Sequence, residues 1–141
     1  MRRILTSVVF AVLLFPSLAM GETMDDLVVR EGIHYKKFTD VPFTGKTTGK
    51  IQGTFRNGKK HGPWVEYDEN GRVSSEVTYK NGKKDTWVTY KYFTNGQLMD
   101  KGTYKDGEYD GPWVSYWDNG QLRYKGTYKD GEYDGPWVSY W

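Results

Sequence analysis

Histidine is a common general base and metal ligand, and this chain contains only His34 and His61. The residues around His61 recur along the chain, and the matching position is taken by Asp85, Asp110 and Asp134. A general base or a metal ligand is not expected to change identity in this way between copies of one unit. Both histidines are therefore predicted to be solvated turn residues.

Alternate acidic residues precede a glycine in the segment from Asp106 to Gly111, and the segment from Asp130 to Gly135 repeats the arrangement. Such spacing is superficially similar to a calcium loop, in which every second residue supplies an oxygen ligand. The two earlier copies carry the lysine pairs Lys59-Lys60 and Lys83-Lys84 at these positions. This comparison favours a turn over a metal site, and the sequence predicts neither a metal nor a cofactor.

Nucleophiles are equally sparse. The chain has no cysteine, which excludes thiol catalysis, thiolate metal sites, disulfides and a lipoprotein anchor. Ser115 and Ser139 are equivalent positions of a repeat, and no arrangement of serine, histidine and aspartate is readable. We therefore expect a protein that is not an enzyme.

Aromatic residues are the best functional candidates. Tyrosine and tryptophan combine a large apolar area with a polar tip, so a row of them suits sugars, lipid headgroups or a protein hot spot. In a sheet of one layer the same rings must also serve as core. The predicted binding strip consists of Tyr104, Tyr109, Trp113, Trp117, Tyr124 and Tyr128.

The elements that position these rings are repeats. The segment Gly102 to Trp117 returns unchanged as Gly126 to Trp141, and two looser copies precede it. The glycines that follow Asn or Asp at 58, 82, 107 and 131 stand 24, 25 and 24 residues apart. A fixed period of this length indicates a repeat architecture in which neighbouring units bury a face against each other.

Each repeat reads as strand, turn, strand, turn. Asn-Gly and Asp-Gly pairs mark tight hairpins, and the intervals between them leave no room for a crossover helix. The sequence thus predicts an all-β, elongated, single-layer antiparallel meander of eight or nine strands. A two-residue turn at Asp106-Gly107 places Tyr104 opposite Tyr109 and Gly102 opposite Gly111. Alternation places Arg123, Lys125 and Lys129 on the face opposite the rings.

Proline complicates this pattern, because Pro63, Pro112 and Pro136 fall where an interior strand should pair. Proline has no amide to donate to a neighbouring strand. Either the strand begins only at the following tryptophan, or the strand contains a bulge. The sequence leaves both possibilities open.

The N-terminal segment 1–21 is predicted to be a secretory signal peptide. Arg2 and Arg3 precede an apolar run from Ile4 to Phe15, and small residues suit cleavage after Ala19 or Gly21. A membrane anchor is the alternative, but the run of about a dozen residues is shorter than the roughly 20 that a spanning helix needs. Residues 22–33 are expected to be a linker, and residues 34–141 the repeat array, with a degenerate half-repeat at its start.

The net charge of the chain limits the kinds of partner that it could bind. The chain has 20 Lys and Arg and 18 Asp and Glu, and residues 1–21 hold two of the basic residues and none of the acidic ones. Removal of that segment leaves 18 of each, so the mature chain is neutral and lacks the basic patch that nucleic-acid binding requires. A protein partner is expected, with cell-wall glycan or a membrane surface as alternatives.

The run from Gly107 to Trp113, followed by Asn119 to Leu122, resembles the MORN repeat in its bacterial variant form. The pattern recurs over residues 34–141, although the copy at Asp85 to Trp87 is one residue shorter before the tryptophan. The resemblance implies a sheet of hairpins that binds or scaffolds, without catalysis. Some bacterial members are labelled antitoxins, which suggests an antitoxin or immunity protein as a further alternative to an exported binding protein or a glycan-binding module.

Overall fold

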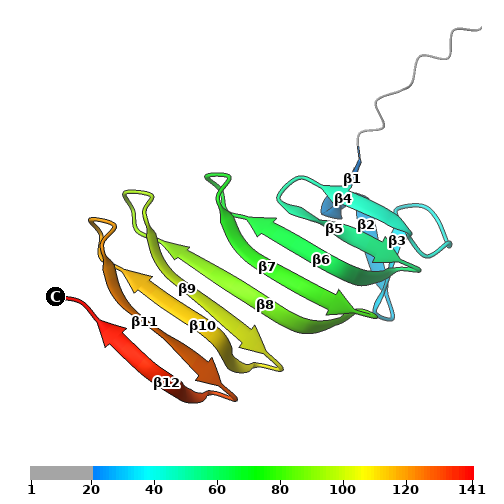
Figure 1. Cartoon of the computed structure of the whole chain (residues 1–141). Helices are drawn as coiled ribbons and strands as arrows, with labels where there is room; N and C mark the ends of the chain where they lie inside the picture. Colours follow the sequence, from blue (N-terminus) through cyan, green and yellow to red (C-terminus); the bar gives the residue numbers. More distant parts are fainter. Residues whose placement is uncertain (1–20) are drawn as a thin grey trace, which may run out of the picture.

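The computed structural model describes residues 21–141, so the predicted signal peptide lies outside the described residues apart from Gly21. Residues 21–141 form a ten-stranded sheet and a two-stranded sheet (Figure 1). In the large sheet β1 pairs with β4 in parallel and all other neighbours are antiparallel. Its strands, in spatial order, are β1 (Glu22–Thr23), β4 (Gly45–Thr48), β5 (Ile51–Arg56), β6 (Lys59–Tyr67), β7 (Val73–Lys80), β8 (Lys83–Tyr92), β9 (Leu98–Lys105), β10 (Glu108–Tyr116), β11 (Leu122–Lys129) and β12 (Glu132–Ser139).

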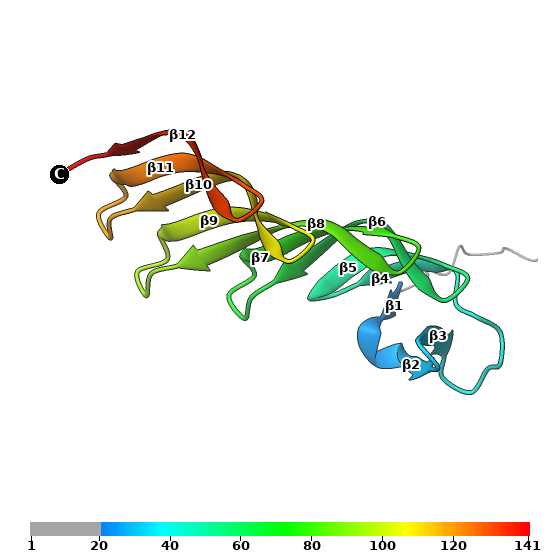
Figure 2. The same ribbon diagram turned by 90° about the horizontal axis from the view of Figure 1, so that it is seen from below.

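The predicted meander of hairpins is confirmed from β4 to β12, where strands adjacent in the chain are adjacent in the sheet. The meander from β4 to β12 has nine strands, which agrees with the expected eight or nine, and β1 adds a tenth strand to the sheet. The sheet is open and extends along one direction, and its strands are twisted and curved (Figures 1 and 2). No helix in residues 21–141 is long and apolar enough to cross a membrane.

Two kinds of turn alternate along the sheet. At Asp106-Gly107 both residues have positive φ, 51° and 95°, which is the type I′ conformation that matches the twist of paired strands. Asn57-Gly58 and Asn81-Gly82 adopt the same conformation. At the other end of the hairpins, only the glycine of each Asn-Gly pair has positive φ; these glycines are Gly71, Gly96 and Gly120.

The prolines lie inside continuous strands at bulges, which decides between the two possibilities that the sequence leaves open. Tyr109 pairs with Tyr104, but the next paired residue of β10 is Trp113, which lies opposite Gly102. Strand β10 thus contains two more residues than β9 at this point. The pairing of Gly102 with Gly111 predicted from the sequence is therefore wrong. Gly111, with φ of 114°, permits the bulge just before Pro112.

The bulge of strand β8 is shorter than the others, because its sequence has one residue fewer before Trp87. Thr78 pairs with Thr86 and Tyr79 pairs with Lys84, so only Asp85 is extra. The missing residue before Trp87 therefore shortens the bulge from two residues to one, and the meander continues without interruption.

A second layer covers one end of the large sheet. Residues 22–33, expected to be a linker, instead contribute β1, a 3-10 helix η1 (Met24–Asp26) and β2 (Leu27–Arg30). β2 pairs with β3 (Ile33–Lys36) through a turn at Glu31-Gly32, and this hairpin lies against the β4–β5 end (Figure 2). The prediction of a single layer holds only beyond this end.

The buried core sits between these two layers. Leu27 of the small sheet packs with Phe55, Trp64, Val77 and Tyr79 of the large sheet. Phe55 and Trp64 are 0% and 1% exposed. The core is therefore concentrated at the N-terminal end of the repeat array.

Candidate functional site

A row of four tyrosines crosses neighbouring strands at the other end of the sheet. Tyr104, Tyr109, Tyr128 and Tyr133 come from β9, β10, β11 and β12, in that spatial order. Successive ring centroids are 4.7, 4.9 and 5.1 Å apart, with planes inclined by only 26–34°. We call these four residues the tyrosine row. Each ring overlaps its neighbours, so the row presents mainly ring edges and hydroxyl groups.

Tryptophans flank the row and fix it in place. Trp113 meets Tyr109 and Tyr128 edge-on, at centroid distances of 5.0 and 6.1 Å. Trp137 meets Tyr128 and Tyr133 in the same manner, at 5.1 and 4.6 Å. Edge-to-face contacts of this kind add attraction beyond the burial of area. The bulge before each tryptophan carries its ring over a glycine of the preceding strand.

The earlier copies use lysine where the row has its second and fourth tyrosines. Lys60 and Lys84 occupy the repeat position of Tyr109 and Tyr133. The Lys60 ammonium lies 4.3 Å from the ring centroid of Trp64, and that of Lys84 lies 5.4 Å from Trp87. These cation–π contacts occupy the face where tyrosines stack in the later copies, so the continuous tyrosine row is confined to β9–β12.

Coverage of this face changes along the sheet. The His34 ring of the small sheet lies 4.5 Å from Phe55, which holds the repeat position of Tyr104 and Tyr128. The second layer therefore covers the same face that bears the tyrosine row. Beyond it, Tyr109 is 37% exposed and Tyr133 is 71% exposed. On this one continuous face, the aromatic rings are therefore buried at one end of the sheet and exposed at the other.

The two central tyrosines of the row, Tyr109 and Tyr128, have raised pKa values. Burial, followed by a hydrogen bond with Tyr133, raises the pKa of Tyr128 to about 12. A hydrogen bond with Tyr104 is the main cause of the raised pKa of Tyr109. The hydroxyl groups of Tyr109 and Tyr128 therefore remain protonated at ordinary pH and act as hydrogen-bond donors and acceptors.

The structure brings together four of the six residues of the predicted strip: Tyr104, Tyr109, Trp113 and Tyr128. Tyr124 lies on the same face beside Trp137, with ring centroids 6.1 Å apart. Sequence reasoning omitted Tyr133 and Trp137 from the strip, although they repeat Tyr109 and Trp113 in the identical copy. That identity was the signal that could have found them.

Trp117 is placed differently from the prediction. It follows the last residue of β10, and its amide donates to the carbonyl of Gln121 in the turn, at 2.8 Å. The Arg123 guanidinium lies 4.5 Å above its ring, although alternation predicted Arg123 on the opposite face. The cause is a register shift between β10 and β11. Ser115 pairs with Tyr124 and Tyr116 with Leu122, so Arg123 has no partner on β10.

The residues considered for acid–base or metal chemistry have other contacts. The Asp110 carboxylate pairs with the Lys129 ammonium at 2.6 Å. His34 lies in the junction between the two sheets, where its Nδ1 is 3.1 Å from the carbonyl oxygen of Gly58. Within residues 21–141, no group of three or more His, Asp or Glu side chains is arranged to hold a metal ion.

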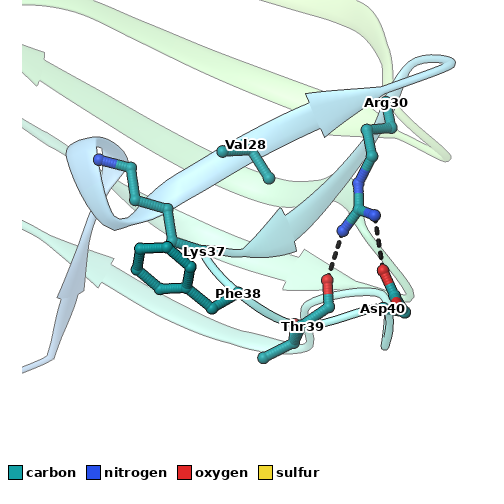
Figure 3. Close-up of a pocket in the computed structure, with 6 residues that line it drawn as sticks. All are labelled: Val28, Arg30, Lys37, Phe38, Thr39 and Asp40. Carbon is teal, nitrogen blue, oxygen red and sulfur yellow. Dashed lines mark hydrogen bonds and ion pairs between the residues drawn. The ribbon is translucent and has the colours of Figure 1, made fainter.

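An open cavity of about 700 Å³ lies beside the small sheet, outside the regular repeats (Figure 3). Arg30 bridges its wall, donating to Asp40 Oδ1 at 2.6 Å and to the carbonyl of Thr39. Phe38 is fully exposed at 103% and has a φ of 65°, which is unusual for a bulky residue. The charged groups Arg30 and Asp40 form an ion pair, and Lys37 is the third charged residue that lines the cavity.

The fold and this surface define a class: an open array of β-hairpin repeats whose exposed face, rather than an enclosed pocket, is available for recognition. The MORN repeat variant family matches residues 60–81, 88–106 and 109–130. The chain is a MORN-repeat protein, and such repeats indicate a binding or scaffolding role. Comparison with curated proteins yields no match.

Proposed function

We propose that this protein is an exported, non-enzymatic repeat protein that binds a protein partner through the face bearing the tyrosine row. The observation that carries the proposal is the change in coverage along that face. The second layer buries Phe55 and Trp64 at one end, whereas Tyr109 and Tyr133 are exposed on the same face at the other. Exposed aromatic rings held in a fixed arrangement are typical of protein hot spots.

The stacking within the row favours a protein over a sugar as its ligand. A sugar ring packs on an aromatic face, but the faces of Tyr109 and Tyr128 are already covered by neighbouring tyrosines at 4.7–5.1 Å. The exposed ring edges and hydroxyl groups suit a polypeptide surface, which offers apolar groups together with backbone donors and acceptors.

Site-specific photo-cross-linking tests the proposal in the cells that produce the protein. A photoreactive phenylalanine analogue replaces Tyr133 in one variant and Lys125, on the opposite face, in a matched control. We expect the Tyr133 variant to capture a defined protein partner that the Lys125 variant does not. Tyr133→Ala should then weaken binding of that purified partner about thirtyfold, since a ring at a hot spot contributes about 2 kcal/mol.

Capture of the same partner by the Lys125 variant alone would place the interface on the charged face and contradict the proposal. Retention of the protein on purified peptidoglycan, lost in Tyr133→Ala, would support the glycan-binding alternative instead. Unchanged thermal unfolding of Tyr133→Ala is the control for folding.

Export rests on the basic start and the short apolar run of residues 1–21. N-terminal sequencing of the exported chain should begin at Met20 or Glu22. A soluble cytoplasmic chain that retains Met1 would contradict this part of the proposal without affecting the binding surface.

A further inference from the structure

Three turns at one end of the hairpins share a conformation but differ at their first residue. That residue is Asp68 in the first turn, Phe93 in the second and Trp117 in the third. In each turn its amide donates to the carbonyl four residues later at 2.8 Å, and its carbonyl accepts from the turn glycine at 2.9–3.1 Å. The backbone of the turn is therefore the same whether this residue is acidic or aromatic.

The side chains that support the turns explain this tolerance. Asp68 Oδ1 accepts from the amides of Asn70 and Arg72 at 2.8 and 2.9 Å. In the later turns an asparagine side chain accepts such a hydrogen bond. Asn95 Oδ1 accepts from the Gln97 amide at 3.0 Å, and Asn119 Oδ1 accepts from the Gln121 amide at 2.9 Å. The aromatic rings of Phe93 and Trp117 are thus not required to form their turns.

These two rings line a groove of about 520 Å³, together with Thr94, Asp118 and Arg123. Trp117 is 36% exposed. The Arg123 guanidinium lies 4.5 Å from the Trp117 centroid and 5.5 Å from that of Tyr124. In residues 21–141 no acidic side chain forms an ion pair with Arg123. A stacked guanidinium keeps its in-plane N–H groups available for a carboxylate.

We propose that this groove binds a sugar acid, with its carboxylate on Arg123 and its ring against Trp117. The guanidinium fork matches a carboxylate in two parallel hydrogen bonds. The electron-rich face of an indole attracts the polarised C–H groups of a sugar ring. The exposed carboxylate of Asp118 and the hydroxyl of Thr94 would hydrogen-bond the sugar hydroxyls.

The charges of the groove distinguish this ligand from an acidic peptide. Arg123 and Asp118 place one positive and one negative group in the same groove, which matches a ligand unit with one carboxylate for Arg123 and hydroxyl donors for Asp118. An ionised acidic side chain offers Asp118 no such donor. A sugar acid carries a single carboxylate and several neutral hydroxyls on each ring. This site is separate from the tyrosine row. A result that contradicts sugar-acid binding would therefore not contradict the proposed binding of a protein partner.

NMR titration of the full mature chain with tri-galacturonate tests the proposal, with its trimethyl ester as the uncharged counterpart. Two variants remove the groove's contacts. Trp117→Asp installs the residue that the chain itself uses in the equivalent turn, and Arg123→Met removes the charge but keeps an extended side chain. Lys125→Met is the matched control for loss of a positive charge on the same strand.

We expect saturable binding of tri-galacturonate, weakened about tenfold or more in Trp117→Asp and in Arg123→Met but not in Lys125→Met. The trimethyl ester should bind correspondingly weakly to the wild-type chain. Equal binding of acid and ester, absence of binding, or binding unaffected by both variants would overturn the proposal. Equal or tighter binding of hexa-glutamate would overturn it in favour of an acidic peptide. We expect the thermal unfolding of Trp117→Asp to be the same as that of the wild-type chain. If Trp117→Asp does not fold, Arg123→Met tests the proposed site.

Discussion

At the residue scale, the contact between glycine and tryptophan organises each repeat. A Cβ atom built on Gly53 would lie 2.1 Å from the Trp64 ring, and one on Gly102 would lie 2.2 Å from Trp113. Such distances are far inside van der Waals contact. The glycines therefore serve here as space for a ring and not as flexible backbone.

Gly102→Ala should consequently destabilise the protein, by about 1–3 kcal/mol or more, because the Trp113 ring must move off its partner strand. The neighbouring Thr103→Ala, which leaves this contact intact, is the matched control. Chemical denaturation followed by tryptophan fluorescence measures both. A Gly102→Ala chain as stable as wild type would show that the ring can relocate without cost.

At the element scale, the bulge and the glycine occur together. Strands β6, β10 and β12 have a Gly-Pro bulge, and their tryptophans lie over glycines of the preceding strand. Strand β8 has a one-residue bulge, and the residue opposite Trp87 is Val77 instead of glycine. Trp87 instead stacks on Tyr104, at a centroid distance of 5.1 Å and 4° between planes. Where the bulge is one residue shorter and valine replaces the glycine, the tryptophan therefore packs toward the following strand instead of the preceding one.

The junction between the two sheets is a second feature at this scale, and His34 lies in it. Its amide donates to the carbonyl of Gly58 at 2.9 Å, and its carbonyl accepts from the amide of Phe43 at 2.9 Å. Burial is the main cause that lowers the pKa of His34 from 6.5, and the nearby Lys60 acts in the same direction. The neutral imidazole is therefore the form that the folded state favours.

Since the pKa is lower in the folded state, the contribution of His34 to stability is complete above about pH 6.5 and declines as the pH falls through that value. We expect the thermal midpoint of the wild-type chain to decrease between pH 7.5 and pH 5.5. His34→Gln, which cannot titrate, should show a smaller decrease over the same interval. An equal decrease in both chains would assign the effect to other groups.

At the scale of the whole molecule, one continuous face is core at one end and surface at the other. The β2–β3 hairpin closes the end at Phe55, whereas no second layer lies over Tyr133 in the described part of the chain. The same repeat pattern therefore supplies both stability and a candidate binding surface, separated along the length of the sheet.

Truncation of a ring should have opposite consequences at the two ends. Phe55→Ala is expected to lower the free energy of unfolding by about 3–5 kcal/mol, since it leaves a cavity between two layers. Tyr133→Ala should cost below about 1 kcal/mol, because the residue is 71% exposed. Urea denaturation measures both, and similar losses for the two variants would mean that the second layer adds little to stability.

The sequence alone predicted the repeat, its hairpin turns, the antiparallel meander and the common face of Tyr104, Tyr109, Trp113 and Tyr128. These features depend on contacts between residues close in the chain. Asn-Gly and Asp-Gly define turns locally, and alternation along a strand assigns faces. The identity of the last two copies would have added Tyr133 by the same reasoning.

The tertiary structure alone decided the bulges at Pro63, Pro112 and Pro136, the second layer and the position of Trp117. A bulge depends on the partner strand, because the number of residues opposite one another is a property of the pair. The β2–β3 hairpin turns at Glu31-Gly32, which lacks the strong Asn-Gly signal, and it is fixed by packing on Phe55 far along the chain. Trp117 left the predicted strip because a register shift at Arg123 changes which side chains meet, and no single strand encodes that shift.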